Sequence, residues 1–212
     1  MSRAFSLFEL CLVILILGIM LAFAMPNIAL DKLHLAAQQI LIHLRYTQGL
    51  AIMDDKAGLG DEWYKRNWRL FFHSGLVGDS KEHDWRYTVF SDDGKFSGNP
   101  NSLSQIAKDP ANPNKFLTSG FNGQNYKSSL LNKNLNLTKT YGVADIKFKN
   151  CGSKNQTISF DSYGAPSGTL KNAKNPFDKR FLRDCEISLY DEAGKKATIK
   201  IHAITGYAKI IE

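Results

Sequence analysis

The chain has 212 residues, of which 27 are Lys or Arg and 20 are Asp or Glu, so its formal net charge is +7. This length suits a membrane segment plus one globular domain. The moderate charge permits an acidic partner, such as DNA or anionic lipid, without requiring one. The three cysteines form no Cys-x-x-Cys pair and no Cys/His cluster, so no zinc site is indicated.

The first feature along the chain is an apolar run. Residues 10–25 are apolar except for Gly18, and with the apolar residues just before them they reach roughly the 20 residues that a spanning helix needs. Only Arg3 and the N-terminal amine precede the run as positive charges. The positive-inside rule then places the N terminus in the cytoplasm and the rest outside. We predict a transmembrane helix over residues 5–26.

One acid, Glu9, lies at the start of this run, where a carboxylate is costly unless something pairs with it. Three interpretations compete. The first is a secretory signal peptide, with Ala22-Phe23-Ala24 as a small-x-small cleavage site. The second is a plain signal anchor, and the third is a prepilin leader that is cleaved before Phe5. Glu9 argues against the first two, because neither needs an acid there.

The residues themselves carry a family resemblance. Arg3-Ala4, then FSLFEL at residues 5–10 and an apolar helix, resemble the class III signal of type IV pilins and of the pseudopilins of type II secretion. Gly18 and Pro26 match a glycine and a proline that are common in the helix of that family. Ala4 departs from the pattern, because glycine is usual before the cut.

The resemblance implies a processed filament subunit. A prepilin peptidase would cut between Ala4 and Phe5, remove residues 1–4 as a leader and methylate the new amine of Phe5. Glu9 would pair with the N-terminal amine of a neighbouring subunit, since opposite charges removed from water favour pairing. The implied partners are other pilin or pseudopilin subunits, the peptidase, an inner-membrane assembly platform and the lipid bilayer. The implied location is the bacterial inner membrane, with a single span and the C-terminal domain in the periplasm.

Beyond the apolar run the pattern becomes amphipathic over residues 27–54. Apolar side chains recur at helical spacing, which predicts one long helix from Phe5 to about Met53, packed on a sheet. Pro26 should kink or open this helix, because it lacks a backbone N–H and clashes with the preceding turn. We expect His34 and His43 to be surface residues on this segment.

The remaining chain, residues 55–212, reads as a β-rich periplasmic domain. Aromatic and β-branched runs predict strands at 68–72, 85–90, 145–149, 157–160, 185–190, 197–204 and 207–211. Residues 91–140 are rich in Asn, Ser, Lys, Gly and Pro and are expected to form a loop-rich insertion. The predicted fold class is α+β, with the long N-terminal helix of the type IV pilin-like fold packed on an antiparallel sheet.

Two cysteines, Cys151 and Cys185, follow the membrane segment. They are expected to form a disulfide in an oxidising compartment, which in the chain-entropy model would stabilise the domain by about 3–4 kcal/mol. The alternative is a pair of unbonded, buried thiols.

Three segments of the soluble part resemble the H-type minor pseudopilins, the GspH/FimT-like family. They are the helix end LIHLRYTQGLAI (41–52), the Phe-Asp-x-x-Gly segment ISFDSYGAPSGTL (158–170) and the closing strand pair IKIHAITGYAKI (199–210), which is joined by Thr-Gly. The resemblance implies a minor pseudopilin or pilin of a type II secretion or type IV pilus filament that supports protein secretion.

The alternative is a DNA-binding minor pilin for DNA uptake in natural competence. In related proteins the closing hairpin carries basic residues, but here only Lys209 is basic, and Tyr207 stands where arginine is common. A second basic run lies between the two cysteines, and its residues are Lys171, Lys174, Lys179, Arg180 and Arg183. Such residues would contact phosphates without reading sequence, although a solvated loop has the same composition.

The sequence gives no positive indication of an enzyme. It contains no Gly-x-Ser-x-Gly elbow, P-loop, HExxH or dinucleotide-binding fingerprint. We therefore expect no catalytic residues, no cofactor and no metal.

Overall fold

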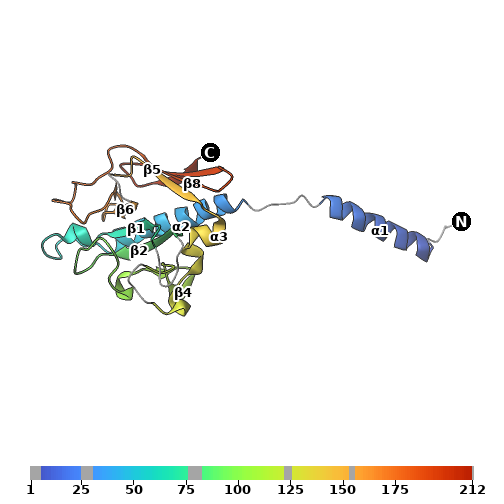
Figure 1. Cartoon of the computed structure of the whole chain (residues 1–212), viewed down its shortest axis with the longest axis horizontal. Helices are drawn as coiled ribbons and strands as arrows, with labels where there is room; N and C mark the ends of the chain where they lie inside the picture. Colours follow the sequence, from blue (N-terminus) through green and yellow to red (C-terminus); the bar gives the residue numbers. More distant parts are fainter. Residues whose placement is uncertain (1–5, 25–30, 76–82, 122–125, 153–155, 212) are drawn as a thin grey trace. The chain divides into compact units, whose positions relative to one another are not determined.

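The computed structural model describes residues 6–24, 31–75, 83–121, 126–152 and 156–211. The chain divides into two compact units, residues 1–31 and 32–212, which are considered separately. The first contains helix α1 (Leu7–Ala24), and the second contains helix α2 (Lys32–Met53) and all the strands (Figure 1). The predicted leader, Pro26 and the rest of 25–30 lie outside the described residues, so the single continuous helix stays a prediction.

Helix α1 carries apolar side chains around its whole circumference. Those of Leu7, Phe8, Ile14, Leu15 and Met20 are all exposed. Within the described residues, no helix combines the length and apolar character that crossing a bilayer requires. The predicted span, residues 5–26, extends past the described part of α1 at both ends and stays a prediction.

Helix α2 is the central element of the second unit. Its buried face follows the predicted helical spacing and consists of Leu33, Ala36, Ala37, Ile40, His43, Leu44, Thr47 and Ala51. This face contacts strands of two different sheets. The expectation that His43 is a surface residue is wrong, because its ring lies on the buried face of the helix.

The fold is mixed α+β with antiparallel sheets. One four-stranded sheet has the order β2-β1-β6-β7 and the other has the order β10-β9-β8-β5. The first consists of β1 (Trp68–His73), β2 (Arg86–Ser91), β6 (Thr157–Phe160) and β7 (Pro166–Ser167). The second consists of β5 (Asp145–Lys149), β8 (Cys185–Tyr190), β9 (Lys196–Ile201) and β10 (Ala208–Ile211).

Each strand predicted from the sequence corresponds to a strand in these sheets, but the expectation of one sheet is wrong. The strands form two sheets because β6 pairs with β1, whereas β8 pairs with β5 and β9. The α2 helix packs on β1 and β6 of one sheet and on β8, β9 and β10 of the other (Figure 1). The main hydrophobic core therefore forms where α2 meets both sheets, and it includes Ile40, Leu70, Ile158 and Ile187.

The insertion at 91–140 consists of short elements, as predicted. They are η2 (Leu103–Gln105), β3 (Lys108–Asp109), β4 (Asn112–Phe116), η3 (Ser128–Leu130), η4 (Lys133–Leu135) and α3 (Leu137–Tyr141). A further 3-10 helix, η1 (Trp63–Arg66), precedes β1. Asn136 caps α3 by accepting a hydrogen bond from the backbone N–H of Lys139, and Gly142 ends the helix in the left-handed conformation. The insertion is joined to the core through the buried side chains of Leu117 and Leu135.

Candidate functional site

Glu9 and Ser6 bond to each other at the start of α1. The backbone N–H of Ser6 donates to Glu9 Oε2 at 2.9 Å, and the backbone N–H of Glu9 donates to Ser6 Oγ at 3.2 Å. This reciprocal pair is a capping box, which satisfies two of the N–H groups that the start of a helix leaves open. Sequence reasoning missed this role of Glu9, although the Ser-x-x-Glu spacing is a known signal for it.

The structure describes few contacts of the other residues that were predicted for processing and assembly. Ala4, Phe5 and Pro26 lie outside the described residues. Gly18 lies within α1, and a Cβ atom built there would meet no other heavy atom within 4 Å. The described chain therefore does not crowd position 18.

The three segments that resemble H-type pseudopilins meet on the C-terminal half of α2. The side-chain amide of Gln48 donates to the carbonyl oxygen of Gly164 and to that of Thr205, both at 2.8 Å. Arg45, one turn earlier, donates to the carbonyl oxygen of Ala208 at 3.0 Å. We call this arrangement of the helix, the 161–165 turn and the 202–207 turn the motif junction.

Two glycines allow the two turns to approach each other so closely. A Cβ atom on Gly206 would lie 2.3 Å from the carbonyl oxygen of Gly164 and 2.6 Å from Gln48 Nε2. A Cβ atom on Gly164 would lie 2.9 Å from Gln48 Nε2. Both glycines also have positive φ angles, 68° at Gly206 and 77° at Gly164, which other residues adopt only at a cost.

Asp161 shapes the turn that carries Gly164. Its Oδ1 accepts hydrogen bonds from the backbone N–H groups of Tyr163 at 3.0 Å and Ala165 at 2.8 Å. Its Oδ2 accepts a hydrogen bond from Arg180 at 2.5 Å. In a tight turn some backbone N–H groups have no carbonyl partner, and an aspartate side chain can accept their hydrogen bonds instead. The Phe-Asp-x-x-Gly pattern thus has a local structural reason.

Large apolar side chains are exposed on these same three segments. The exposed residues are Ile52 and Met53 at the end of α2, Tyr163 on the first turn, and Ile204 and Tyr207 on the second. The Tyr207 ring also lies against Arg45, with the guanidinium carbon 5.8 Å from the ring centre. Exposed apolar side chains gathered at one place on a domain are typical of contact surfaces for another protein.

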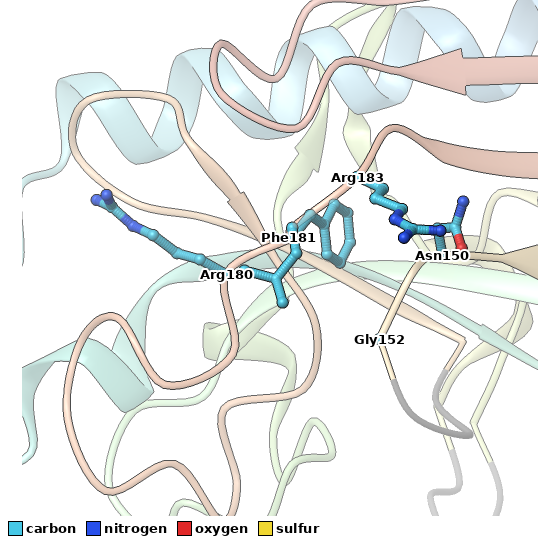
Figure 2. Close-up of a pocket in the computed structure, with 6 residues that line it drawn as sticks. Asn150, Gly152, Arg180, Phe181 and Arg183 are labelled. Carbon is cyan, nitrogen blue, oxygen red and sulfur yellow. The ribbon is translucent and has the colours of Figure 1, made fainter.

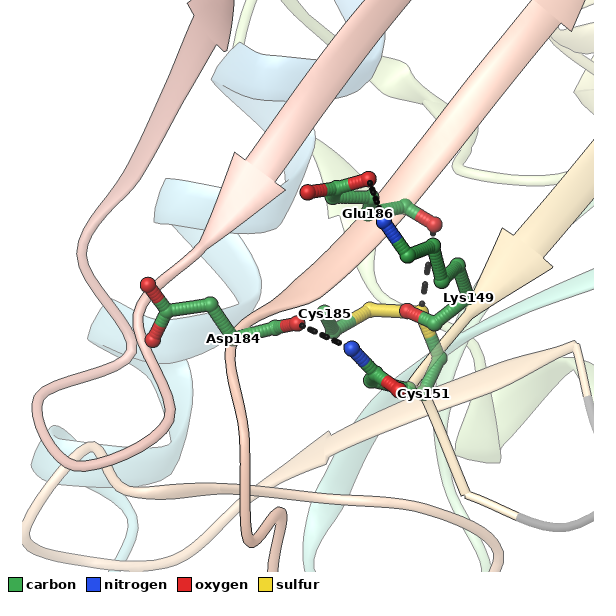
Figure 3. Close-up of a disulfide and its surroundings, with 6 residues drawn as sticks. Lys149, Cys151, Asp184, Cys185 and Glu186 are labelled. Atoms are coloured by element: carbon green, nitrogen blue, oxygen red, sulfur yellow. Dashed lines mark hydrogen bonds and ion pairs between the residues drawn. A yellow bond between two sulfur atoms is a disulfide. The ribbon is translucent and has the colours of Figure 1, made fainter.

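The predicted disulfide between Cys151 and Cys185 is present (Figure 3). It ties the residues after β5 to the first residue of β8, and both half-cystines are buried. Across the same strand pair Lys149 forms an ion pair with Glu186 at 3.2 Å, and Asn150 donates to the carbonyl oxygen of Asp184. The bond thus fixes one end of the β10-β9-β8-β5 sheet. The third cysteine, Cys11, is unbonded and lies on α1.

The predicted basic run does not form one patch of available cations. Arg180 is paired with Asp161, and Lys179 is paired with Asp178 at 3.2 Å. The pKa of the Asp178 carboxyl is lowered by a hydrogen bond from the backbone N–H of Lys174 and by the Lys179 ammonium group. Asp178 within the run and Asp161 on a neighbouring turn therefore offset part of its charge.

The remaining predicted phosphate-contacting residues are scattered. Lys171, Lys174, Arg183 and Lys209 are exposed. Lys171 packs against Gly98 of the insertion, whereas Lys209 lies on β10 in the other sheet, beside Lys200. This distribution gives little support to a continuous DNA-binding surface.

Two shallow pockets lie beside the disulfide. One, of about 350 Å³, is lined by Arg180 and Arg183 together with Asn150, Gly152, Phe181 and Leu182. Figure 2 shows the two arginines pointing to opposite sides of Phe181, with Arg183 beside Asn150. The other, of about 340 Å³, is lined by Lys179, Arg180 and Asp178 among others. Because the arginines diverge, they do not converge on one ligand atom in the first pocket.

His43 belongs to a polar network beneath α2 that sequence reasoning missed. Its Nδ1 lies 2.7 Å from the hydroxyl of Tyr87, which also accepts a hydrogen bond from Gln39 at 2.8 Å. Tyr141 donates to the Oε1 of Gln39 at 2.7 Å. Burial lowers the pKa of His43, so its neutral form is favoured. The network links α2 to β2 and α3, and a lone histidine on a helix gave no pattern that could have revealed it.

Within the described residues, no group of three or more His, Cys, Asp or Glu side chains could hold a metal ion. Comparisons with protein-family models, with curated proteins and with solved structures found no match.

Proposed function

We propose that this chain is a minor pseudopilin or minor pilin of the H-type, a subunit of a type II secretion or type IV pilus filament that supports protein secretion. The observation that carries the proposal is the motif junction. Three segments that resemble one family in sequence are far apart along the chain, yet hydrogen bonds from Gln48 and Arg45 join them across 116, 157 and 163 residues. The resemblance thus concerns one structural unit.

The apolar helix supplies the assembly element in this proposal. A helix with apolar side chains on all sides needs lipid or protein around it, and the apolar side chains of α1 are exposed in the isolated chain. Residues 5–26 would lie in the inner membrane and pack side by side with the helices of other subunits. The second unit would lie in the periplasm, where the Cys151–Cys185 disulfide is stable.

Glu9 would gain a second partner during assembly. In the isolated chain its carboxylate accepts the backbone N–H of Ser6. Cleavage before Phe5 would create an ammonium group on each subunit, and this group is a stronger partner for a carboxylate than a neutral N–H, particularly away from water. A carboxylate has room for several hydrogen bonds, so Glu9 can bind the amine of a neighbour and still cap its own helix.

The test separates the charge of Glu9 from its capping role. Glu9→Gln keeps an oxygen that accepts the Ser6 N–H but removes the charge, and Ser6→Ala removes the other half of the capping box but keeps the charge. We expect Glu9→Gln and Glu9→Ala to leave cleavage largely intact and to impair secretion or piliation. Ser6→Ala should assemble nearly normally. Normal assembly of both Glu9 variants would contradict the proposal.

A further inference from the structure

A groove of about 400 Å³ lies between α2 and the insertion. One wall is helical, and the other comes from the turn between β3 and β4, from η4 and from the end of α3. Two of the residues that line it, His43 and Asp109, have only 7% and 4% of their surface exposed. An imidazole and a carboxylate are therefore held in place in a cavity of the size that small-molecule sites usually have.

The direction of each hydrogen bond around His43 follows from its partners. Gln39 Nε2 lies 3.0 Å from the carbonyl oxygen of Asn134, which can only accept, so this atom must be the amide nitrogen. The same nitrogen donates to the Tyr87 hydroxyl at 2.8 Å. Tyr87 is fully buried, so its hydroxyl proton needs an acceptor within the protein. Within the described structure that acceptor is His43 Nδ1, at 2.7 Å.

His43 therefore carries its proton on Nε2. Burial lowers the pKa of the imidazole, against the opposing charge of Asp109, so the ring is neutral at neutral pH. The Nε2 atom makes no hydrogen bond to the described residues, and water can reach it, unlike the sealed Nε2 of His73. Since His43 lines the groove, its Nε2–H group is a donor that remains available there.

Asp109 supplies the matching acceptor. Its Oδ1 accepts the backbone N–H of Ala111 at 2.8 Å, and its Oδ2 accepts the side-chain amide of Asn132 at 2.6 Å. These bonds fix the carboxylate and leave about two of its four acceptor positions open. Burial and then the Asp109 charge raise the pKa of Tyr46 on α2, so the carboxylate faces the helix. None of the described residues that line the groove is Lys or Arg, so the lining offers this carboxylate no cation.

A fixed donor and a fixed acceptor in one groove select a ligand that both accepts and donates. A hydroxyl group does both through a single atom, whereas an ammonium group cannot accept and an ionised carboxylate cannot donate. Gln38 and Asn134 also line the groove, and their side-chain amides can bond hydroxyls in either direction. Leu35 and Ile42 add apolar surface that suits the C–H face of a sugar ring. We propose that this groove binds a saccharide through its hydroxyl groups.

A peptide is the main alternative, because its backbone also donates and accepts. Extended peptides are usually held by the free edge of a sheet. The insertion side of this groove is instead formed by a hairpin turn and two short helical elements. A helical peptide needs an apolar groove, whereas most of the residues that line this one are polar. The observations therefore favour the saccharide.

The experiment uses the full chain in dodecylphosphocholine micelles, because this detergent carries no sugar. The probes are maltotetraose, cellotetraose and chitotetraose, with tetraglycine as the peptide probe. Isothermal titration calorimetry should show saturable binding of at least one oligosaccharide and no binding of tetraglycine. Ala111→Trp places a large side chain at the groove without removing a donor or an acceptor, since Ala111 is an exposed turn residue that lines it. This variant should bind the oligosaccharide about tenfold more weakly or worse.

Ala193→Trp is the matched control, because Ala193 is also an exposed turn residue but lies before β9 in the other sheet. It should bind the oligosaccharide as the wild type does. Equal binding by Ala111→Trp and Ala193→Trp would overturn the proposal. Binding of tetraglycine alone, or absence of saturation by every oligosaccharide at about 10 mM, would also overturn it.

Nitrogen NMR of the His43 ring in the wild-type chain tests the donor itself. The spectrum should show a protonated Nε2 and an unprotonated Nδ1, as the bond from Tyr87 requires. The Nε2 signal should shift when the oligosaccharide binds. A proton on Nδ1, or an Nε2 signal that does not respond to a bound oligosaccharide, would contradict the proposed site.

Discussion

The motif junction makes a sharp prediction for Gly206→Ala. The new Cβ atom would lie 2.3 Å from the carbonyl oxygen of Gly164 and 2.6 Å from Gln48 Nε2, so the two turns must separate. A left-handed φ of 68° costs a non-glycine residue about 1–2 kcal/mol. Loss of the two Gln48 hydrogen bonds adds about 1 kcal/mol each. We therefore expect the free energy of unfolding to fall by about 3–4 kcal/mol.

Gly194→Ala is the control for the backbone cost alone. Gly194 has a φ of 81°, but a Cβ atom there would meet nothing within 4 Å. This variant should lose only about 1–2 kcal/mol. Thermal unfolding followed by circular dichroism should show a fall in melting temperature of about 6–16 °C for Gly206→Ala and about 2–8 °C for Gly194→Ala, at about 2–4 °C per kcal/mol. Equal shifts for the two variants would refute the close packing of the junction.

Three further predictions concern stability. Replacing both Cys151 and Cys185 with Ala should lower the free energy of unfolding by about 3–4 kcal/mol for a bond that spans 34 residues, and denaturant unfolding that is unchanged by the replacement would contradict this. Burial and the nearby Arg86 lower the pKa of His73 to about 4. As the pH falls, this histidine is therefore protonated in the unfolded chain before it is protonated in the folded chain. Stability should therefore decline as pH falls from about 6.5 to 4, and His73→Gln should flatten this decline in pH-dependent melting curves. Asp161→Ala should cost more than Asp161→Asn, since asparagine keeps an acceptor for the two turn N–H groups; equal melting temperatures would show that these bonds contribute little.

The strands were predictable because each is a short aromatic or β-branched run that ends near turn residues. In β9, Ile199 and Ile201 are buried and Lys200 between them is only partly buried, which is the alternation of a strand with one face on the core. The division into two sheets was not predictable, since it depends on which distant strands pair. Strand β6 follows β5 in the sequence, yet it pairs with β1.

The candidate site shows the same limits. The disulfide was predictable because the domain was expected to be exported and contains two cysteines. Glu9 was predicted to have a role because an acid is unusual in an apolar run. The capping box of Ser6 with Glu9 had a sequence signal that was not used. The contacts of Gln48 with two distant turns had none, because a polar residue on an amphipathic helix gives no indication of its partners. The pairing of acids with Lys179 and Arg180 was likewise not predictable from the sequence.

The mass of the N-terminal peptide of the mature protein, isolated from the membranes of its native host, tests the central proposal most directly. The proposed function predicts a chain that starts at Phe5 with a methylated amine and retains Glu9 as its fifth residue. A chain that starts at Met25 would show that a signal peptidase had removed the apolar helix together with Glu9, and this result would contradict the account.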